Sequence, residues 1–175
     1  MTVVGLDLGG TKIAAGVFDG TRLLSKVVLP TPEEGGMAVV QALAEATRKA
    51  EAEAGVEGVA IGLGTPGPLD FKEGVIRFTP NIRGLVNFPI RRLLEEATKR
   101  PVHLENDANA AALAEHHLGA ARGEGSSLFL TVSRLCPAPF WPGEGALPGQ
   151  GGTPFPERAC PPYYLALEGP TSRAR

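Results

Sequence analysis

The sequence predicts an α/β domain built around a mixed β-sheet. Three apolar segments at the start of the chain are typical of consecutive strands, and helical and strand-like segments then alternate as far as residue 133. A run of leading strands followed by helix–strand alternation indicates a sheet that contains both antiparallel and parallel pairs.

The first two predicted strands, 3–8 and 13–18, flank the turn Gly9-Gly10-Thr11-Lys12. Glycines let backbone N–H groups approach a ligand closely, while the threonine and lysine add a hydroxyl and a cation. A phosphate chain is the anionic ligand that suits such a turn best. Asp7 stands beside it and would hold Mg²⁺ through water. An ordinary hairpin with a solvated Asp7 explains the same pattern, so both interpretations stay open here.

A third strand is predicted at 22–29, followed by a helix over 37–54 with apolar residues at helical spacing and Gly55 as its C-cap. The apolar segment 56–63 is predicted to be a buried, partly parallel strand. It leads into Gly64-Thr65-Pro66-Gly67-Pro68, a rigid loop at the carboxyl end of a strand, which is where ligands bind in open α/β sheets.

The remaining elements are a short strand at 74–78, a polar loop at 79–84, a helix at 88–100, a strand at 101–105 and a helix at 110–118. Asp107 stands between the last two, where it would serve as the helix N-cap or as a general base toward a substrate hydroxyl. Its neighbour Asn106 offers a donor and an acceptor, as sugar recognition requires. Asn81 would either contact the sugar or simply form a turn.

The composition excludes several classes of function. A net charge of −2 over 175 residues gives no electrostatic argument for nucleic acid or an anionic membrane, and no apolar stretch is long enough to span a bilayer. The start of the chain lacks signal-peptide features, which favours the cytoplasm. The two cysteines and the three histidines, His103, His116 and His117, have no metal-type spacing, so no metal site is expected from them.

Taken together, four motifs resemble the ROK family of bacterial glucokinases, other sugar kinases and sugar-responsive repressors. The motifs are Asp7-Leu8-Gly9-Gly10-Thr11-Lys12, the segment 62–68, Pro80-Asn81-Ile82, and the segment from Glu105 to Ala112. They occur in the family's order, and the resemblance covers about residues 1–133.

The resemblance implies an actin-like, ribonuclease-H-like fold of two lobes that hold ATP and a sugar between them. It assigns Gly9, Gly10, Thr11 and Lys12 to the ATP phosphates, with Asp7 near Mg²⁺. It assigns Gly64, Thr65, Asn81, Asn106 and Asp107 to the sugar, and makes Asp107 the base that activates the 6-hydroxyl group. The implied reaction is ATP-dependent phosphorylation of a hexose, with glucose favoured. Homodimers occur in the family, although the resemblance gives no direct argument for one here.

The composition changes at Arg134. Nine of the 16 prolines follow that point, where the family's second glycine-rich phosphate loop, a Glu-x-Gly-His motif and a zinc site are expected but not found. The sequence therefore predicts an amino-terminal lobe at 1–120, the first strand of a second lobe at 121–133, and an irregular Pro/Gly-rich tail at 134–175. A frameshifted reading of the gene would explain the tail, and resequencing the junction would test this.

Two alternatives stand beside the kinase. The first alternative is a catalytically inactive sugar-binding lobe. Phosphoryl transfer needs an enclosed site, and half of the ATP clamp is not recognised in the sequence. A repressor of the same family is less favoured, because those proteins carry a helix-turn-helix ahead of the glycine turn and here only six residues precede Asp7.

Overall fold

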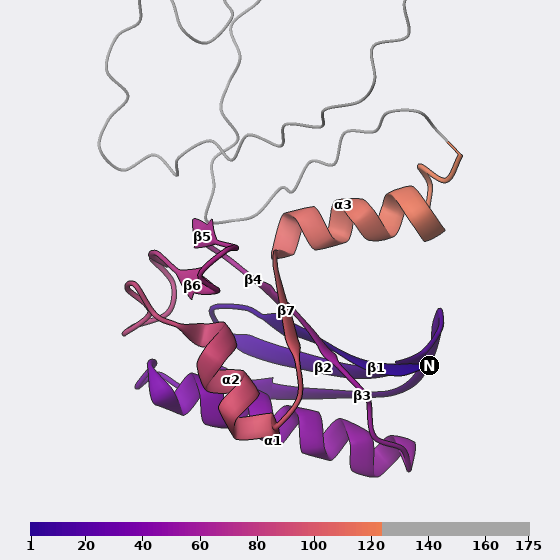
Figure 1. Cartoon of the computed structure of the whole chain (residues 1–175), viewed down its shortest axis with the longest axis horizontal. Helices are drawn as coiled ribbons and strands as arrows, with labels where there is room; N and C mark the ends of the chain where they lie inside the picture. Colours follow the sequence, from indigo (N-terminus) through magenta and orange to yellow (C-terminus); the bar gives the residue numbers. More distant parts are fainter. Residues whose placement is uncertain (124–175) are drawn as a thin grey trace, which may run out of the picture.

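The computed structural model describes residues 1–123, which form a five-stranded mixed sheet in the order β3-β2-β1-β4-β7 (Figure 1). The strands of this sheet are β1 (Thr2–Leu8), β2 (Lys12–Asp19), β3 (Arg22–Pro30), β4 (Ile61–Thr65) and β7 (Val102–Asn106). The helices are α1 (Met37–Ala54), α2 (Ile90–Thr98) and α3 (Asp107–Leu118), and β5 (Leu69–Asp70) pairs with β6 (Val75–Ile76) in a separate hairpin. β1, β2 and β3 are antiparallel, whereas β1, β4 and β7 run parallel, so the predicted mixed sheet is confirmed.

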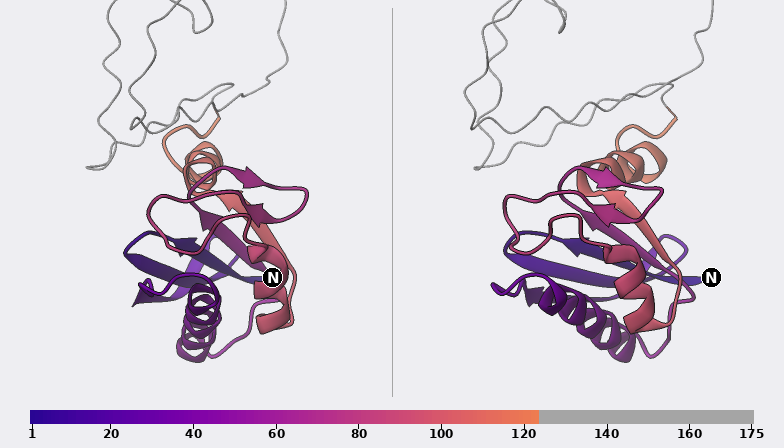
Figure 2. Two further views of the ribbon diagram at one scale, coloured as in Figure 1. Left: turned by 90° about the vertical axis from the view of Figure 1, so that its left-hand side faces the viewer. Right: turned by 60° about the vertical axis from the view of Figure 1, so that its left-hand side comes forward.

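One face of the sheet carries the apolar core. In β1 the alternate residues Val4, Leu6 and Leu8 are buried, as the period of a strand with one covered face requires. Figures 1 and 2 show α1 and α2 on this side of the sheet, with α3 on the opposite side near the ends of β4 and β7. The fully buried residues from the helices include Val39, Leu43, Ile90 and Leu94. The core therefore fixes the parallel strands from one side only.

Helix α1 has the predicted bounds, Met37–Ala54. Its buried residues recur at helical spacing and pack on the sheet, which stabilises the helix more than its intrinsic propensity does. Gly55 ends the helix with φ of 67°, a left-handed conformation that favours glycine.

The strand predicted at 56–63 is wrong in its first half, because β4 begins only at Ile61. Val56 and Val59 are exposed, and the chain there runs close to the start of β1, where the Val59 N–H donates to the Thr2 carbonyl at 2.9 Å. Apolar composition alone does not distinguish this connecting segment from a strand. The helix predicted at 88–100 is shorter, Ile90–Thr98, because Lys99 adopts a left-handed conformation with φ of 56°.

A buried ion pair joins α1 to the segments that precede β4 and β7. The Arg100 guanidinium donates to both carboxylate oxygens of Glu51, the bond to Oε2 measuring 2.9 Å. The Gly58 N–H also donates to Glu51 Oε1 at 2.8 Å, and Arg100 donates to the Gly58 carbonyl. Burial alone would raise the pKa of Glu51, but these hydrogen bonds and the Arg100 charge outweigh it and hold that pKa below its ordinary value.

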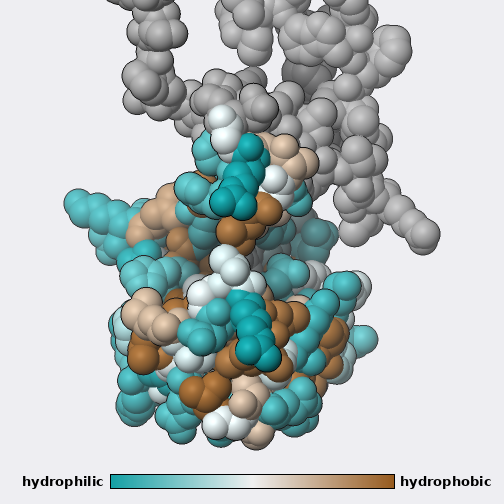
Figure 3. All heavy atoms as spheres, turned by 90° about the vertical axis from the view of Figure 1, so that its right-hand side faces the viewer, coloured by the Kyte–Doolittle hydropathy of each residue, from teal (hydrophilic) through white to brown (hydrophobic). Residues whose placement is uncertain are grey.

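Apolar side chains also reach the surface of the described domain, and Figure 3 shows several of them among polar neighbours on one side. The largest exposed fractions after Met1 belong to Val86 and Leu118, both 61% exposed. Among the described residues, no helix has the length and apolar character needed to cross a membrane. Residues 124–133 of the segment predicted as the first strand of a second lobe, and the tail at 134–175, lie outside the described residues.

Candidate active site

The carboxyl ends of the three parallel strands bring the predicted site residues together. In the sheet register, Asp7 of β1 is paired with Gly64 of β4, and Gly64 is paired with Glu105 of β7. These three positions form one row across the sheet, on the face opposite the core, because Leu6, Leu63 and Leu104 one position earlier are buried. The carboxyl edge of parallel strands is where open α/β sheets bind ligands.

The glycine turn follows β1 directly and is held in place by Thr31. The Gly9 N–H donates to the Lys12 carbonyl at 2.9 Å, which closes the turn. The Thr31 hydroxyl donates to the Gly9 carbonyl at 2.7 Å, and the Thr31 N–H donates to the Thr11 carbonyl at 3.1 Å. Among the described residues, the N–H groups of Gly10 and Thr11 have no hydrogen-bond acceptor. Two unpaired donors beside a lysine are what an anion-binding turn requires.

Asn81 lies against this turn from a separate loop. Ile82 is buried and the buried Thr79 hydroxyl donates to the Ile82 carbonyl at 3.0 Å, so the loop is anchored on both sides of Asn81. A Cβ atom on Gly10 would lie 3.0 Å from the Asn81 Cβ, closer than such atoms ordinarily approach. The close approach of the two loops therefore favours glycine at position 10, and the exposed Asn81 side chain is accessible to a ligand.

Helix α3 starts earlier than predicted, and its cap is Asn106, not Asp107. The Asn106 side-chain oxygen accepts hydrogen bonds from the N–H groups of Ala108 at 3.0 Å and Asn109 at 3.2 Å. Asp107 is the first helical residue, and its carboxylate accepts from the Ala108 N–H at 2.8 Å. Asn106 takes the capping role because it stands one residue earlier, in extended conformation, where its short side chain reaches the second and third N–H groups. Asp107 is exposed at the positive end of the helix dipole.

Glu105 fixes this helix start from the strand side. Its Oε1 atom accepts from the Asn106 N–H at 2.8 Å and from the Asn109 side-chain amide at 3.1 Å. Hydrogen bonds thus link the polar residues at 105, 106 and 109 to one another. Asp107 therefore lies at a helix start whose neighbouring residues are fixed on both sides.

Asp107 lies close enough to Asp7 for its charge to affect the pKa of Asp7. Although the Asp7 side chain reaches solvent, partial desolvation at the strand end raises its pKa above the ordinary value, the negative charge of Asp107 raises it further, and the Lys12 ammonium partly opposes both. Gly64 of β4 lies between the two aspartates: it is paired with Asp7 in the sheet, and a Cβ atom on Gly64 would lie 3.7 Å from the Asp107 Cα. Two neighbouring carboxylates whose charges are only partly offset by a lysine are typical of a site that binds a metal, a proton or a polar ligand.

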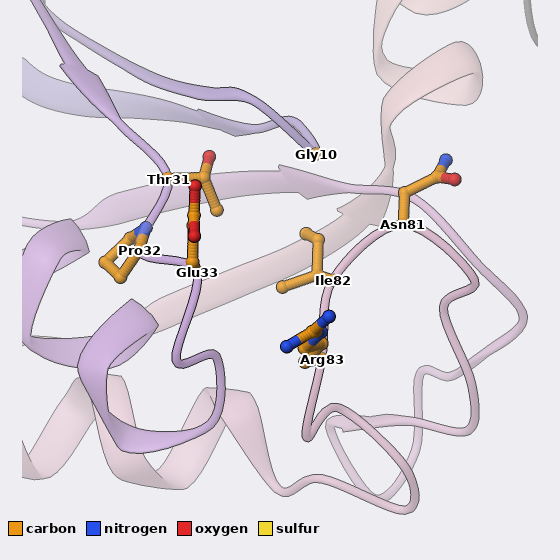
Figure 4. A pocket seen from close by; sticks show the side chains of 7 residues that line it. All are labelled: Gly10, Thr31, Pro32, Glu33, Asn81, Ile82 and Arg83. Atoms are coloured by element: carbon orange, nitrogen blue, oxygen red, sulfur yellow. The ribbon is translucent and has the colours of Figure 1, made fainter.

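A cavity of about 350 Å³ opens between the glycine turn and the Asn81 loop (Figure 4). Its lining residues come from three segments: Gly10, then Thr31, Pro32 and Glu33, then Asn81, Ile82 and Arg83. The lining is largely polar, which suits a hydroxylated or charged ligand better than an apolar one.

The structure thus places the predicted residues in two adjoining groups. Gly10 lies with Asn81 beside the cavity, and Asp7 lies with Gly64 and Asp107 at the strand ends. Thr65 differs from the rest because its side chain is fully buried, which leaves only its backbone to contact a ligand. Within residues 1–123, no cluster of three metal-ligating side chains occurs, and the rings of His116 and His117 only meet edge to face, 5.3 Å apart.

Three residues of the site were missed in the sequence. Thr31, Glu105 and Asn109 act on their neighbours through hydrogen bonds that the fold creates. Glu105 and Asn109 belong to the motif around Asp107, and their spacing of four on a strand-to-helix junction was an available signal. Thr31 lies 20 positions after Thr11, and no local pattern links the two.

Comparison with known proteins agrees with this geometry. A ROK hexokinase structure from Thermus thermophilus is 79% identical, with a TM-score of 0.68, and the match covers 70% of this chain and 41% of that one. A ROK glucokinase structure from Streptomyces griseus, in complex with glucose and AMPPNP, is 39% identical with a TM-score of 0.66, over 70% of this chain and 38% of that one. The glucokinase of Thermotoga maritima is 37% identical over 134 residues, which are 75% of this chain and 42% of the relative.

These likenesses confirm the predicted actin-like fold, and the chain spans about 40% of the length of the relatives it matches. The family model named "ROK family" matches residues 3–154, so it extends beyond Ser133, where the resemblance was expected to end. Because that match covers most of the sequence and the solved relatives share the fold of the described domain, the chain belongs to the ROK family.

Proposed function

We propose that this chain forms the amino-terminal lobe of an ATP-dependent hexose kinase that phosphorylates the 6-hydroxyl group, with glucose as the favoured sugar. The observation that carries the proposal is the meeting of Asp7, Gly64 and Asp107 at the carboxyl ends of parallel strands, next to a glycine turn with N–H donors that find no acceptor within residues 1–123. The names of the relatives, hexokinase and glucokinase, support the same reaction.

In this proposal the turn Gly9–Lys12 receives the ATP phosphates. The free N–H groups of Gly10 and Thr11 would donate to phosphate oxygens, and the Lys12 ammonium would offset their charge. Asp7 fits a magnesium ion bound through water, because its carboxylate is exposed and a cation would relieve its repulsion with Asp107. Mg²⁺ bound with ATP would neutralise charge on the phosphates.

The sugar would bind between the Asn81 loop and the start of α3. Because the Asn106 oxygen is occupied by two backbone N–H groups, its amide nitrogen is the part left to donate to a sugar hydroxyl. Asp107 would accept the proton of the sugar 6-hydroxyl as that hydroxyl oxygen attacks the γ-phosphorus of ATP, the bond from this phosphorus to the β,γ-bridging oxygen breaks, and ADP leaves. The carboxylate is solvent-exposed and held at a hydrogen-bonded helix start, which suits a base that must meet its substrate directly.

The test is ATP-dependent glucose phosphorylation by the purified chain, followed by coupled oxidation of the 6-phosphate product. Asp107→Asn should abolish the activity, whereas the matched control Asp19→Asn, at the far end of β1 and β2, should retain it. Activity that survives Asp107→Asn would overturn the role of this residue. A folded chain that binds glucose and ATP without turnover would identify the inactive lobe instead, and a chain that binds neither would overturn the proposal.

The two-lobe division at residues 120 and 133 and the cytoplasmic location stay predictions, and the sequence gives no argument for a homodimer of this chain. Analytical ultracentrifugation of the purified chain would decide the oligomeric state.

A further inference from the structure

We propose that Thr31 is the positioning residue of the glycine turn, because its two hydrogen bonds fix the direction in which the turn presents N–H groups to an anionic ligand. The inference deepens the proposed function and rests on it for the identity of the ligand. It concerns a residue outside all four family motifs recognised in the sequence.

The contacts of Thr31 are built into the fold rather than made at the surface. Thr31 is only 9% exposed and follows the last residue of β3. Its hydroxyl donates to the Gly9 carbonyl at 2.7 Å, and its backbone N–H donates to the Thr11 carbonyl at 3.1 Å. One residue thus holds carbonyl groups at both ends of the Gly9–Thr11 segment.

Peptide geometry converts these contacts into a direction. In a planar trans peptide the carbonyl of one residue and the N–H of the next point to opposite sides. Because Thr31 draws the Gly9 carbonyl toward β3, the N–H of Gly10 must point away from β3. The Gly10 N–H has no acceptor among the described residues, so it is available to a ligand on that side. Glycines on their own would leave this peptide free to rotate.

The residue type and its neighbours suit the task. Thr31 lies between Pro30 and Pro32, and a residue that precedes proline is restricted to extended conformations. Its β-branched side chain has few rotamers, which keeps the hydroxyl directed at Gly9. Valine has nearly the same shape but no donor, and serine keeps the donor but loses the methyl group. These two substitutions therefore separate the hydrogen bond from the packing.

The first experiment measures ATP affinity by calorimetry in the full chain and in three variants. Thr31→Val should weaken ATP binding by about 10-fold, the effect of losing about one net hydrogen bond, and Thr31→Ser should stay within about 3-fold of the unaltered chain. Thr47→Val is the matched control, because Thr47 is fully buried and its hydroxyl also donates to a carbonyl, that of Leu43 at 2.9 Å, but within α1. It should lose stability without losing ATP affinity.

The second experiment needs no ligand and therefore distinguishes this inference from the proposed function. The ¹⁵N relaxation of the Gly10 amide should indicate a rigid backbone in the unaltered chain and in Thr47→Val, with an order parameter of about 0.85. In Thr31→Val the order parameter of this amide should fall below about 0.6. If the unaltered chain fails to bind ATP, the proposed function is contradicted, and this measurement alone decides whether Thr31 fixes the turn. An unchanged Gly10 amide in Thr31→Val, or unchanged ATP affinity in a chain that binds ATP, would overturn the inference.

Discussion

Two pairs of charged side chains lie at opposite ends of the parallel strands. At the amino ends of β4 and β7, Glu51 and Arg100 have opposite charges and are joined by hydrogen bonds. At the carboxyl ends, Asp7 and Asp107 carry the same charge, and the Asp107 charge contributes to raising the pKa of Asp7. The first pair lowers the pKa of its acid and the second pair raises it. The difference separates a part of the sheet that stabilises the fold from a part that we propose binds a ligand.

The largest expected effect of breaking this contrast is on catalysis. Asp107→Asn keeps the size of the side chain but removes its ability to take a proton, so glucose phosphorylation should fall by roughly 10²–10⁴-fold, the usual contribution of a general base. The variant should keep the stability of the unaltered chain, because Asn106 still caps the helix. Steady-state rates together with urea unfolding of the same samples check both statements.

The next effect is on stability, at the other end of the strands. Glu51→Gln leaves Arg100 without its buried partner and should lower the free energy of unfolding by roughly 3 kcal/mol at pH 7. Since the folded-state pKa of Glu51 lies below its ordinary value, the stabilisation by its carboxylate is complete above that ordinary value and is lost as pH falls through the folded-state pKa. The urea midpoints of the unaltered chain and of Glu51→Gln should therefore differ at pH 7 and lie closer together at pH 3. Glu45→Gln, which disrupts an exposed pair with Lys49, is the control and should leave the midpoint unchanged.

A smaller effect is expected at the cap of α3. Asn106→Ala removes the acceptor of two N–H groups and should cost about 1 kcal/mol, whereas Asn106→Ser keeps a capping oxygen and most of the stability. Both variants lose the side-chain amide that is proposed to contact the sugar. Glucose affinity should thus fall in both, while stability falls mainly in the alanine variant. A serine variant with unchanged glucose affinity would restrict Asn106 to capping.

The smallest effect is a gain in stability at Asp7. Because the pKa of Asp7 is higher in the folded chain than its ordinary value, the ionised carboxylate destabilises the fold at neutral pH. Asp7→Asn should raise the thermal unfolding midpoint at pH 7, and the gain should vanish as pH falls below the unfolded-state pKa. Asp19→Asn should give no such gain, since Asp19 pairs with the amino terminus at 3.0 Å. Loss of stability in Asp7→Asn at pH 7 would contradict the contrast.

The sequence predicts the local elements of this domain better than the contacts between distant residues at either end of the sheet. The helix at 37–54 and the first three strands follow from periodicity and turn residues, because their hydrophobic faces lie on a single core. The motif at Asp107 indicated the strand-to-helix junction, but Asn106 and Asp107 are both good capping residues, and only backbone conformation decides between them. The bonds of Thr31 to the turn and of Arg100 to Glu51 join residues distant in the chain, and local patterns do not reveal them.

The pKa values of the individual carboxyl groups test the contrast most directly, by ¹³C NMR titration of the unaltered chain and of Asp107→Asn. The account predicts that Asp7 titrates above 3.8 and Glu51 below 4.5 in the unaltered chain. In Asp107→Asn the Asp7 pKa should fall part of the way back, since burial still raises it, and the Glu51 pKa should not change. An Asp7 pKa that is not raised, or that does not respond to Asp107→Asn, would contradict the account.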